Sequence, residues 1–534
     1  MEPKVAYLSS EFALSDALPI YAGGLGVLAA DILYQAAESQ IPLAGITVFY
    51  RDGFFKQRID PNGTQKSFYD RIDPQTAGLT DTGSIIKIPL ADRELSLKIW
   101  RKDVSFKGEN SVPLFLMDAD IEENRPEDRK ITDRLYERVW APHIFDDLVL
   151  GVGSVRLVRE LKLPITVWHI NDDHGTLNIL ERIREYLSQG DSLEEAREKV
   201  RNETVFTTHT PVVGAESKFS REELFPLLDS LFAGIDINLE EIWQLGKREW
   251  QGQESFSLTV FAMRHAREVN AVSKKHFAIS QELWRFIGEK VPTTYVTNAI
   301  YAPRWTPAEK EKLVIKKRAA QETQQISLDG KTFDPNSLVL AWCRRFAAYK
   351  QPNLLLNDEE RLLKILTNPD KPVYLLMSGK AHPEDPEGQE FVRRVIAFSR
   401  RPEVKERFIY IPNYSLTSAP SLLAASDVWI STPKVGWEAS GTSGMKAIFN
   451  QSLNAMTPDG WWPEGYNGKN GWLIEPQGED YATPLYRIIE EEIVPTYYQN
   501  KEKWQEMVEE SLKSCGEKFN SDRMLAEYKK LYRI

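Results

Sequence analysis

The sequence predicts an α/β protein with doubly wound parallel sheets, and three observations support this class. Short apolar runs alternate with longer amphipathic runs, which is the order of parallel strands joined by crossover helices. This alternation restarts after a polar stretch at residues 322–336. A chain of 534 residues also exceeds what one hydrophobic core usually holds. We therefore expect two Rossmann-like domains with a boundary near residue 320.

The first half is predicted to begin with a buried strand, a glycine-rich loop and a helix, after which strands and helices continue to alternate. A ligand of such a sheet binds outside the carboxyl ends of its strands, so the loops that follow the strands are the candidate site. The predicted elements are strands at Val5–Leu8, Ile46–Tyr50 and Ile165–Ile170, and helices at Val27–Ser39 and Gly175–Glu185.

The second half repeats the pattern and ends in a charged helical segment. The expected strands are Ser337–Trp342, Val373–Met377, Phe408–Ile411 and Val428–Ile430, and a helix is expected from Met445 to Leu453. From Glu490 to Ile534, tyrosine, tryptophan and leucine recur at helical offsets among charged residues.

Composition narrows the function classes. The net charge of −11 disfavours nucleic acid and anionic lipid as partners, and we expect neither nucleic-acid nor membrane binding. No apolar run approaches the length of a membrane span, and the first residues lack the pattern of a signal peptide, so a cytoplasmic location is expected. The two cysteines, Cys343 and Cys515, have no metal-binding spacing and are expected to be reduced.

The run from Trp437 to Lys446 carries the strongest functional signal. It combines a carboxylate, two glycines, several hydroxyls and a lysine between a predicted strand and a predicted helix. Backbone N–H groups that gather at a helix start attract phosphate. Lys446 could be a further phosphate contact, or an amine that forms a Schiff base with an aldehyde cofactor. The second alternative implies pyridoxal phosphate.

These residues resemble the α-glucan phosphorylases of glycogen, starch and maltodextrin. The segment Glu438-Ala-Ser-Gly-Thr-Ser-Gly-Met-Lys446 is similar to the signature that ends in the cofactor lysine of that family. Further similarity extends along the chain and looks like the short, non-animal branch. It is carried by Tyr21–Gly26, Arg344–Lys350, Asp459–Trp462 and Asn470–Trp472.

The resemblance implies a B-type glycosyltransferase fold, in which two Rossmann-like domains face a central cleft and a C-terminal helical tail crosses back. The expected domains are a glucan-binding domain at residues 1–320, a pyridoxal-phosphate domain at 321–489 and a tail at 490–534 that packs on the first domain. It also implies retaining phosphorolysis of α-1,4-glucan or maltooligosaccharide to α-glucose 1-phosphate, with inorganic phosphate as co-substrate and pyridoxal phosphate as a proton-exchange cofactor. Phosphorylation control is not expected, and the sequence leaves the oligomeric state open, with a homodimer as one candidate.

The same resemblance assigns site residues. The catalytic set is Lys446, Arg345, Lys350 and His209, with Arg345 and Lys350 on the substrate phosphate. The cofactor would be held by Lys446, Thr442, Ser443, Arg344, Tyr414, Trp305 and Gly24. The substrate would be bound by Gly23, Gly24, Asn298, Glu438, Ala439, Ser440, Gly441, Asp172 and His174. Taken singly, most of these residues have ordinary structural roles; Asp172, for example, is as well explained as a helix cap.

Three departures from the family pattern bear on affinity and acceptor choice. Ala299 stands where many members have glycine, and Ser415 stands where long-chain members have arginine. The segment Arg138–His143 replaces an expected glycine-rich stretch. Two rival interpretations remain: a nucleotide-sugar glucan synthase of the same fold, which would have lysine at Tyr21 and no role for Lys446, and a glucan-binding pseudoenzyme.

Overall fold

The computed structural model describes residues 2–137, 144–212, 216–288 and 291–534, and the chain forms two compact units. Unit 1 comprises Met1–Phe54, Tyr69–Thr297 and Met524–Ile534, and unit 2 comprises Phe55–Phe68 and Asn298–Arg523. The excursion of residues 55–68 into unit 2 is fixed by hydrogen bonds: the backbone N–H of Gln57 donates to Asn413 Oδ1 (2.9 Å), and Gln57 Nε2 donates to the Gly379 carbonyl (3.1 Å).

Unit 1 is built on a nine-stranded sheet in the order β14-β13-β9-β8-β1-β2-β7-β6-β5. The strands from β14 to β7 are parallel, and β6 and β5 extend the edge in antiparallel fashion. The order reverses between β1 and β8, which is the switch point of a doubly wound sheet. The strands are β1 (Val5–Leu8), β2 (Leu43–Val48), β5 (Thr80–Leu90), β6 (Arg93–Val104), β7 (Val112–Asp118), β8 (Val167–Asn171), β9 (Thr204–Thr207), β13 (Glu268–Ala271) and β14 (Thr294–Tyr295).

Helices and a small sheet complete unit 1. Two of the helices begin with a full capping box. The hydroxyls of Ser192 and Ser220 accept from the backbone N–H groups of Glu195 and Glu223, and the carboxylates of these glutamates accept from the backbone N–H groups of the serines. The helices are α1 (Gly24–Glu38), α2 (Ile144–Glu160), α3 (Asn178–Ser188), α4 (Leu193–Glu203), α5 (Arg221–Leu231), α6 (Leu239–Gly246), α7 (Leu258–Arg264) and α8 (Lys274–Leu283), and the small sheet holds β10 (Lys218–Phe219), β11 (Lys247–Trp250) and β12 (Gln253–Ser257).

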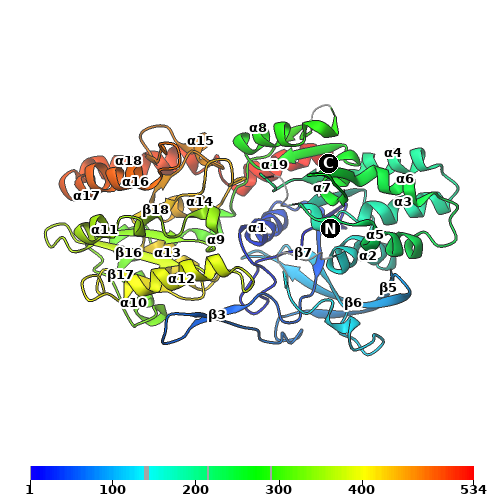
Figure 1. The fold of residues 1–534 in the computed structure, drawn as a ribbon, viewed down its shortest axis with the longest axis horizontal. Helices are drawn as coiled ribbons and strands as arrows, with labels where there is room; N and C mark the ends of the chain where they lie inside the picture. The colour runs from blue at the N-terminus through cyan, green and yellow to red at the C-terminus, as the bar shows by residue number, and fades with distance from the viewer. Residues whose placement is uncertain (1, 138–143, 213–215, 289–290) are drawn as a thin grey trace. The chain divides into compact units, whose positions relative to one another are not determined.

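Unit 2 is built on a six-stranded parallel sheet in the order β17-β16-β15-β18-β19-β20. Strands β16, β17 and β18 of this sheet are labelled in Figure 1. Numbered along the chain, the strand order is 3-2-1-4-5-6, the order of the doubly wound dinucleotide-binding sheets. Its switch point lies between β15 and β18. The strands are β15 (Leu338–Cys343), β16 (Val373–Ser378), β17 (Phe408–Ile411), β18 (Val428–Ser431), β19 (Leu453–Met456) and β20 (Gly471–Leu473), and residues 55–68 add the hairpin β3 (Lys56–Ile59) and β4 (Gln65–Phe68).

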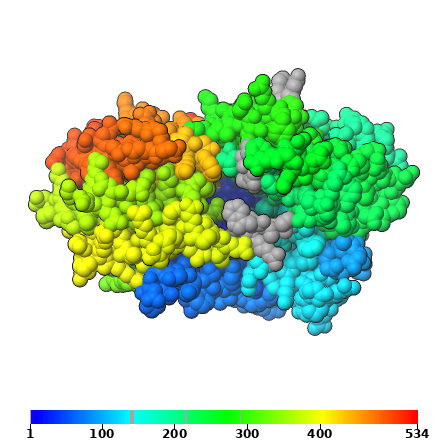
Figure 2. Space-filling model, in the orientation of Figure 1, coloured from blue at the N-terminus to red at the C-terminus, as the bar shows by residue number. Residues whose placement is uncertain are grey.

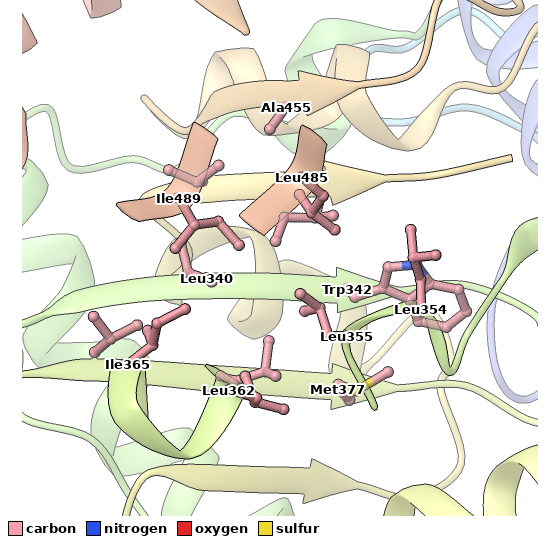
Figure 3. Close-up of a cluster of buried hydrophobic side chains, with 14 of the residues drawn as sticks. Leu340, Trp342, Leu354, Leu355, Leu362, Ile365, Met377, Ala455, Leu485 and Ile489 are labelled. Carbon is pink, nitrogen blue, oxygen red and sulfur yellow. The ribbon is translucent and has the colours of Figure 1, made fainter. Parts of the chain in front are cut away.

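The core of unit 2 forms where these strands meet their covering helices (Figure 3). Leu340 and Trp342 project from β15, and Leu362 and Ile365 project from the adjacent helix α11 (Glu359–Leu366). Further helices are α9 (Ala302–Trp305), α10 (Lys312–Ile326), α12 (Pro386–Ser399), α13 (Ser418–Ala425), α14 (Ser443–Phe449), α15 (Trp462–Gly465), α16 (Ala482–Arg487), α17 (Val494–Gln499) and α18 (Lys501–Cys515).

Helix α10 belongs to unit 2 because two of its lysines reach into that unit. Lys312 Nζ donates to the carbonyls of Ala424, Ser426 and Asn450 at 2.6–3.2 Å. Lys316 Nζ pairs with Asp427 Oδ2 at 2.6 Å. The chain therefore passes from unit 1 to unit 2 between Thr297 and Asn298. The boundary near residue 320 that the sequence suggested lies inside helix α10.

The end of the chain is divided between the units. A π-helix at Ile488–Ile493 and the helices α17 and α18 belong to unit 2, where Ile493, Met507 and Val508 enter the core. This segment, orange to red in Figure 2, lies at the surface of unit 2. The last helix, α19 (Ser521–Tyr532), passes into unit 1, where the Tyr532 hydroxyl is 2.6 Å from His169 Nδ1.

Most predicted strands appear within one or two residues of their expected places, but the helix predicted at Met445–Leu453 was wrong at both ends. Helix α14 begins at Ser443 and ends at Phe449, because Leu453–Met456 is the buried strand β19. Helix α1 begins at Gly24, earlier than the expected Val27. Among the helices of the described residues, none combines the length and apolar character that a bilayer crossing requires. Both cysteines are free thiols in buried positions.

Candidate active site

The side chain of Lys446 is buried on α14 against an aromatic ring. Its Nζ lies 3.9 Å from the ring centroid of Trp305, and only 5% of the residue is exposed. Asn450, at the end of the same helix, joins the two segments: its Nδ2 donates to the Lys446 carbonyl (3.0 Å) and to the Trp305 carbonyl (2.8 Å). The sequence motif did not reveal Asn450. Lys446, which is predicted to carry the cofactor, is therefore desolvated. It lies beside Trp305, which is predicted to hold the same cofactor.

The start of α14 is held close to the sheet. Thr442 is buried at the N-cap, and Ser443 Oγ accepts a hydrogen bond of 3.1 Å from Trp429 Nε1 of β18. A Cβ at Gly444 would stand 2.5 Å from Asn454 Oδ1 on β19, so only glycine fits between helix and strand. These contacts fix the position of Lys446 relative to the carboxyl edge of the sheet.

A carboxylate and two cations meet at the switch point of the unit 2 sheet. Arg344 follows β15, and Glu438 lies in the loop that follows β18. Glu438 Oε2 accepts from Arg344 Nη2 and Lys350 Nζ, both at 2.7 Å. Burial disfavours the carboxylate, but the charges of Lys350 and Arg344 outweigh burial and lower the pKa of Glu438 to about 2. The two cations predicted to hold phosphates are thus neutralised in part by the glutamate predicted to bind sugar hydroxyls.

Further predicted residues of unit 2 lie in loops that follow its strands. The side chain of Arg345 is exposed on the loop after β15. Tyr414 is half-buried near Cys343 and Arg344; burial raises the pKa of its phenol, whereas the Arg344 charge acts in the opposite direction. Gly441 has φ +73°, a left-handed conformation that favours glycine. Ser440 is buried, and Ala439 is half-buried.

Asp459 holds the loop that carries Glu438, a role that the sequence motif did not reveal. Its Oδ2 accepts from the backbone N–H groups of Trp437 (3.1 Å) and Glu438 (2.9 Å). Gly460 is left-handed, and a Cβ there would lie 2.1 Å from the Ser440 carbonyl oxygen. Asp459 lies shortly after the end of β19. Residues beyond the carboxyl ends of parallel strands line the binding crevice, so this position is the sequence signal that could have identified Asp459.

In unit 1, the glycine-rich loop before α1 already holds an anion from the protein itself. Glu11 Oε2 accepts from the backbone N–H groups of Ala22 (2.8 Å), Gly23 (3.1 Å) and Gly26 (3.2 Å). The hydroxyl of Tyr136 donates to Glu11 Oε1 (3.0 Å). The family resemblance assigns Gly23 and Gly24 to the substrate, and Gly24 also to the cofactor. Gly23 and Gly24 have open space where a Cβ would be, whereas Gly26 is packed against Glu11.

We expect Glu11→Ala to lower the free energy of unfolding by about 1–3 kcal/mol, because three backbone donors would lose a charged acceptor. Urea denaturation followed by circular dichroism measures the change. Glu38→Ala, at an exposed position near the end of α1, is the matched control and should stay within about 0.5 kcal/mol of the wild type. Equal stability of the two variants would contradict the role of Glu11 in holding this loop.

Asp172 and His174 follow β8 at the switch point of the unit 1 sheet. Asp172 has φ 66° and ψ 176°, a backbone region that is almost restricted to glycine and is found in functional sites. Burial and the charge of Asp173 raise the pKa of Asp172 well above its ordinary range. Burial disfavours the imidazolium of His174, but Asp147, whose Oδ1 lies 2.8 Å from His174 Nδ1, outweighs it and raises the pKa of His174.

His209 follows the neighbouring strand β9, and its environment keeps the ring neutral. Burial, assisted by His276, lowers the pKa of His209 to about 3. Its Nε2 lies 2.9 Å from Asn171 Oδ1, and its backbone N–H group hydrogen-bonds the Asp172 carboxylate. A neutral ring in this position can serve as a hydrogen-bonding group but does not supply a positive charge.

Several buried polar atoms of unit 2 lack hydrogen-bond partners within the described part of the chain, and two of them belong to predicted site residues. These two are Arg344 Nε and Asn298 Oδ1. Buried donors and acceptors are normally satisfied, and in a binding site the ligand can supply the missing partner. A donor on Arg344 fits an anionic group, and an acceptor on Asn298 fits a hydroxyl. This donor, this acceptor and the buried amine of Lys446 therefore suit a phosphorylated aldehyde cofactor together with a polyhydroxylated substrate.

Comparison with known proteins identifies the family of this chain. The profile of the carbohydrate phosphorylase family matches residues 293–462, which include Arg344, Lys350, Glu438 and Lys446. A maltodextrin phosphorylase of Thermococcus litoralis is 35% identical over 99% of this chain and 70% of its own length. A glycogen phosphorylase of Aquifex aeolicus is 32% identical over 98% of this chain and 85% of its own length. The chain belongs to the carbohydrate phosphorylase family.

Membership in the phosphorylase family confirms the resemblance seen in the sequence, and the chain is accordingly a glycosyltransferase enzyme. An uncharacterized protein of Methanocaldococcus jannaschii is 30% identical over the whole of both chains.

The departures from the phosphorylase pattern have local explanations. Ala299 is fully buried and is not among the left-handed residues of the described chain, so alanine fits there without strain. The side chain of Ser415 is used at the start of α13: its Oγ accepts from the backbone N–H of Ser418 (3.4 Å), and its own backbone N–H donates to Ser418 Oγ (2.9 Å). The segment Arg138–His143 lies outside the described residues.

Proposed function

We propose that this phosphorylase family member is an α-1,4-glucan phosphorylase that transfers a glucosyl unit from a glucan or maltooligosaccharide to inorganic phosphate. The product would be α-glucose 1-phosphate, with retained configuration. The observation that carries the proposal is the cluster of Arg344, Lys350 and Glu438 at the carboxyl edge of the unit 2 sheet, in which Glu438 lies on the loop that leads to α14 and its buried Lys446. The names of the maltodextrin and glycogen phosphorylases that align with nearly the whole chain support it.

The proposed cofactor is pyridoxal 5′-phosphate, tethered by Lys446. Thr442, Ser443 and the unpartnered Nε of Arg344 would hold its phosphate, and Trp305 and Tyr414 would flank its ring, with Gly24 contributing a backbone N–H. When bound, the cofactor supplies a phosphate group that exchanges a proton with the substrate phosphate. The proposal includes a B-type glycosyltransferase fold, with two Rossmann-like domains facing a cleft and a C-terminal tail crossing back.

The remaining site residues are assigned to the substrates. Lys350 and Arg345 would bind inorganic phosphate, with Gly23 and Gly24 adding backbone donors. Because Lys350 Nζ is held by Glu438, an entering phosphate dianion competes with that carboxylate for the ammonium group. Glu438, Ala439, Ser440, Gly441 and Asn298 would bind glucosyl hydroxyls, and His209 would place its carbonyl and neutral ring near the anomeric carbon. Asp172 and His174 would line the acceptor side.

The test is phosphate-dependent release of glucose 1-phosphate from maltoheptaose, measured with a coupled assay. Arg345→Ala should reduce kcat/KM by an amount equal to about 2–4 kcal/mol of transition-state stabilisation, the range for removal of one strong electrostatic donor. Arg393→Ala, which alters an exposed arginine on α12, is the control and should leave the rate unchanged. Glucosyl transfer from ADP-glucose or UDP-glucose without phosphate would instead support a glucan synthase, and binding without turnover would support a pseudoenzyme.

A further inference from the structure

An exposed tryptophan stands beside the charged cluster of unit 2. Trp437 directly precedes Glu438, and 46% of its surface is exposed. Its ring stacks on Tyr349, with centroids 6.2 Å apart and an angle of 26° between the ring planes. Tyr349 in turn directly precedes Lys350. The partly exposed ring of Trp437 therefore offers a flat apolar face beside buried charges.

Two parallel contacts join the segments that carry these residues. The aromatic rings of Tyr349 and Trp437 stack, and the charges of Lys350 and Glu438 pair at 2.7 Å. The backbone adds a third link, since the N–H of Lys434 donates to the Tyr349 carbonyl (2.7 Å). The aromatic surface is therefore fixed relative to the charged cluster.

The backbone of Trp437 is itself held in place. Its N–H group is shared between the Lys434 carbonyl and Asp459 Oδ2, both at 3.1 Å. Gly436, immediately before it, has φ +91°, which turns the chain at this point. A ring held by its neighbour and by its backbone loses little conformational freedom when a ligand packs against it.

We propose that Trp437 forms a stacking surface for a glucosyl ring of the α-glucan substrate. A pyranose has an apolar C–H face and polar hydroxyl edges. A flat aromatic ring beside a carboxylate and an ammonium group matches both features, as in sites where an aromatic wall is combined with a few fixed polar groups. The proposal deepens the proposed function and rests on it for the identity of the sugar. It makes Trp437 a determinant of glucan affinity, separate from the residues that bind phosphate.

The experiment compares Trp437→Ala and Trp437→Phe with the wild type in steady-state phosphorolysis of maltoheptaose. We expect the alanine variant to raise the KM for maltoheptaose about tenfold, while the KM for phosphate and kcat stay within about twofold. The phenylalanine variant retains a smaller ring and should be intermediate. Trp250→Ala removes another exposed tryptophan, on β11 of unit 1, and should leave both KM values unchanged.

An unchanged KM for maltoheptaose in Trp437→Ala would overturn the proposal. A parallel rise in the KM for phosphate would also overturn it, because Trp437 would then only support the pairing of Lys350 with Glu438. If the alanine variant does not fold, the phenylalanine variant decides by the same two KM values.

Calorimetric titration with maltoheptaose in the absence of phosphate separates this inference from the proposed function. If the wild type lacks phosphorolysis but binds the sugar, weaker binding by the Trp437 variants supports the stacking surface although the assigned reaction has failed. Equal binding by wild type and variants, or no binding by the wild type, would overturn it.

Discussion

Replacing Lys446 with alanine should remove the bound cofactor and lower phosphorolysis by about 10³-fold or more, because the cofactor would carry the chemistry that the protein side chains lack. The buried Nζ against Trp305 is the single amine placed for covalent attachment in our assignment. Protein supplied with pyridoxal phosphate should show near-ultraviolet or visible absorbance of a lysine-linked chromophore in the wild type and none in Lys446→Ala. Product formation is measured on the same preparations.

The matched control is Lys434→Ala, which removes an exposed lysine from the loop that also carries Glu438. This variant should keep both the absorbance and the rate. Borohydride reduction and peptide mapping of the wild type locate the modified lysine. Labelling of a lysine other than Lys446, or an undiminished absorbance in Lys446→Ala, would show that the cofactor site has been assigned to the wrong residue.

Replacing Glu438 with alanine should lower the free energy of unfolding by about 3–5 kcal/mol, the range for removing one partner of a buried ion pair. Arg344 and Lys350, both mostly buried, would lose the carboxylate that they share. Inorganic phosphate should restore part of this stability, since a bound anion can replace the lost charge. Thermal denaturation with and without phosphate measures both effects.

The pH dependence of stability gives an independent check. Because the pKa of Glu438 is lowered from 4.5 to about 2 in the folded protein, its stabilising contribution is fully present above pH 4.5 and is lost as the pH falls toward 2. In Glu438→Gln this contribution should vanish, so the variant should lose less stability than the wild type over that interval. Glu479→Ala, at an exposed site, should follow the wild-type curve. Identical pH profiles for Glu438→Gln and wild type would refute the ion-pair account.

The sheet strands could be predicted from the sequence because strands buried on both faces are continuous apolar runs. The predictions at Val5–Leu8 and Phe408–Ile411 coincide with β1 and β17. Helix ends were harder to predict. The end of α14 depends on Leu453 entering the sheet, and the early start of α1 coincides with a loop held by Glu11 from an earlier part of the chain. Both effects come from tertiary contacts that a local pattern does not contain.

The membership of the candidate site stays a prediction, whereas the structure shows a pairing of its charges that the sequence did not indicate. Arg344, Lys350 and Glu438 were assigned through motifs, and their positions after parallel strands explain why they meet. Their mutual neutralisation could not be predicted, because it depends on side chains brought together from separate loops. The same holds for Glu11, whose carboxylate hydrogen-bonds the N–H groups of the glycine loop, and for Asp459, whose contacts are with the backbone.

The close packing of Gly460 against the Ser440 carbonyl has a consequence for efforts to alter substrate choice by directed evolution. The loop from Trp437 to Thr442 packs on Gly460. Any side chain at position 460 would collide with the backbone of this loop at Ser440. Random libraries that include residues 459–461 would therefore consist mainly of misfolded members. Libraries that keep these residues constant and vary position 437 alone would sample changes at the sugar-facing surface in proteins that still fold.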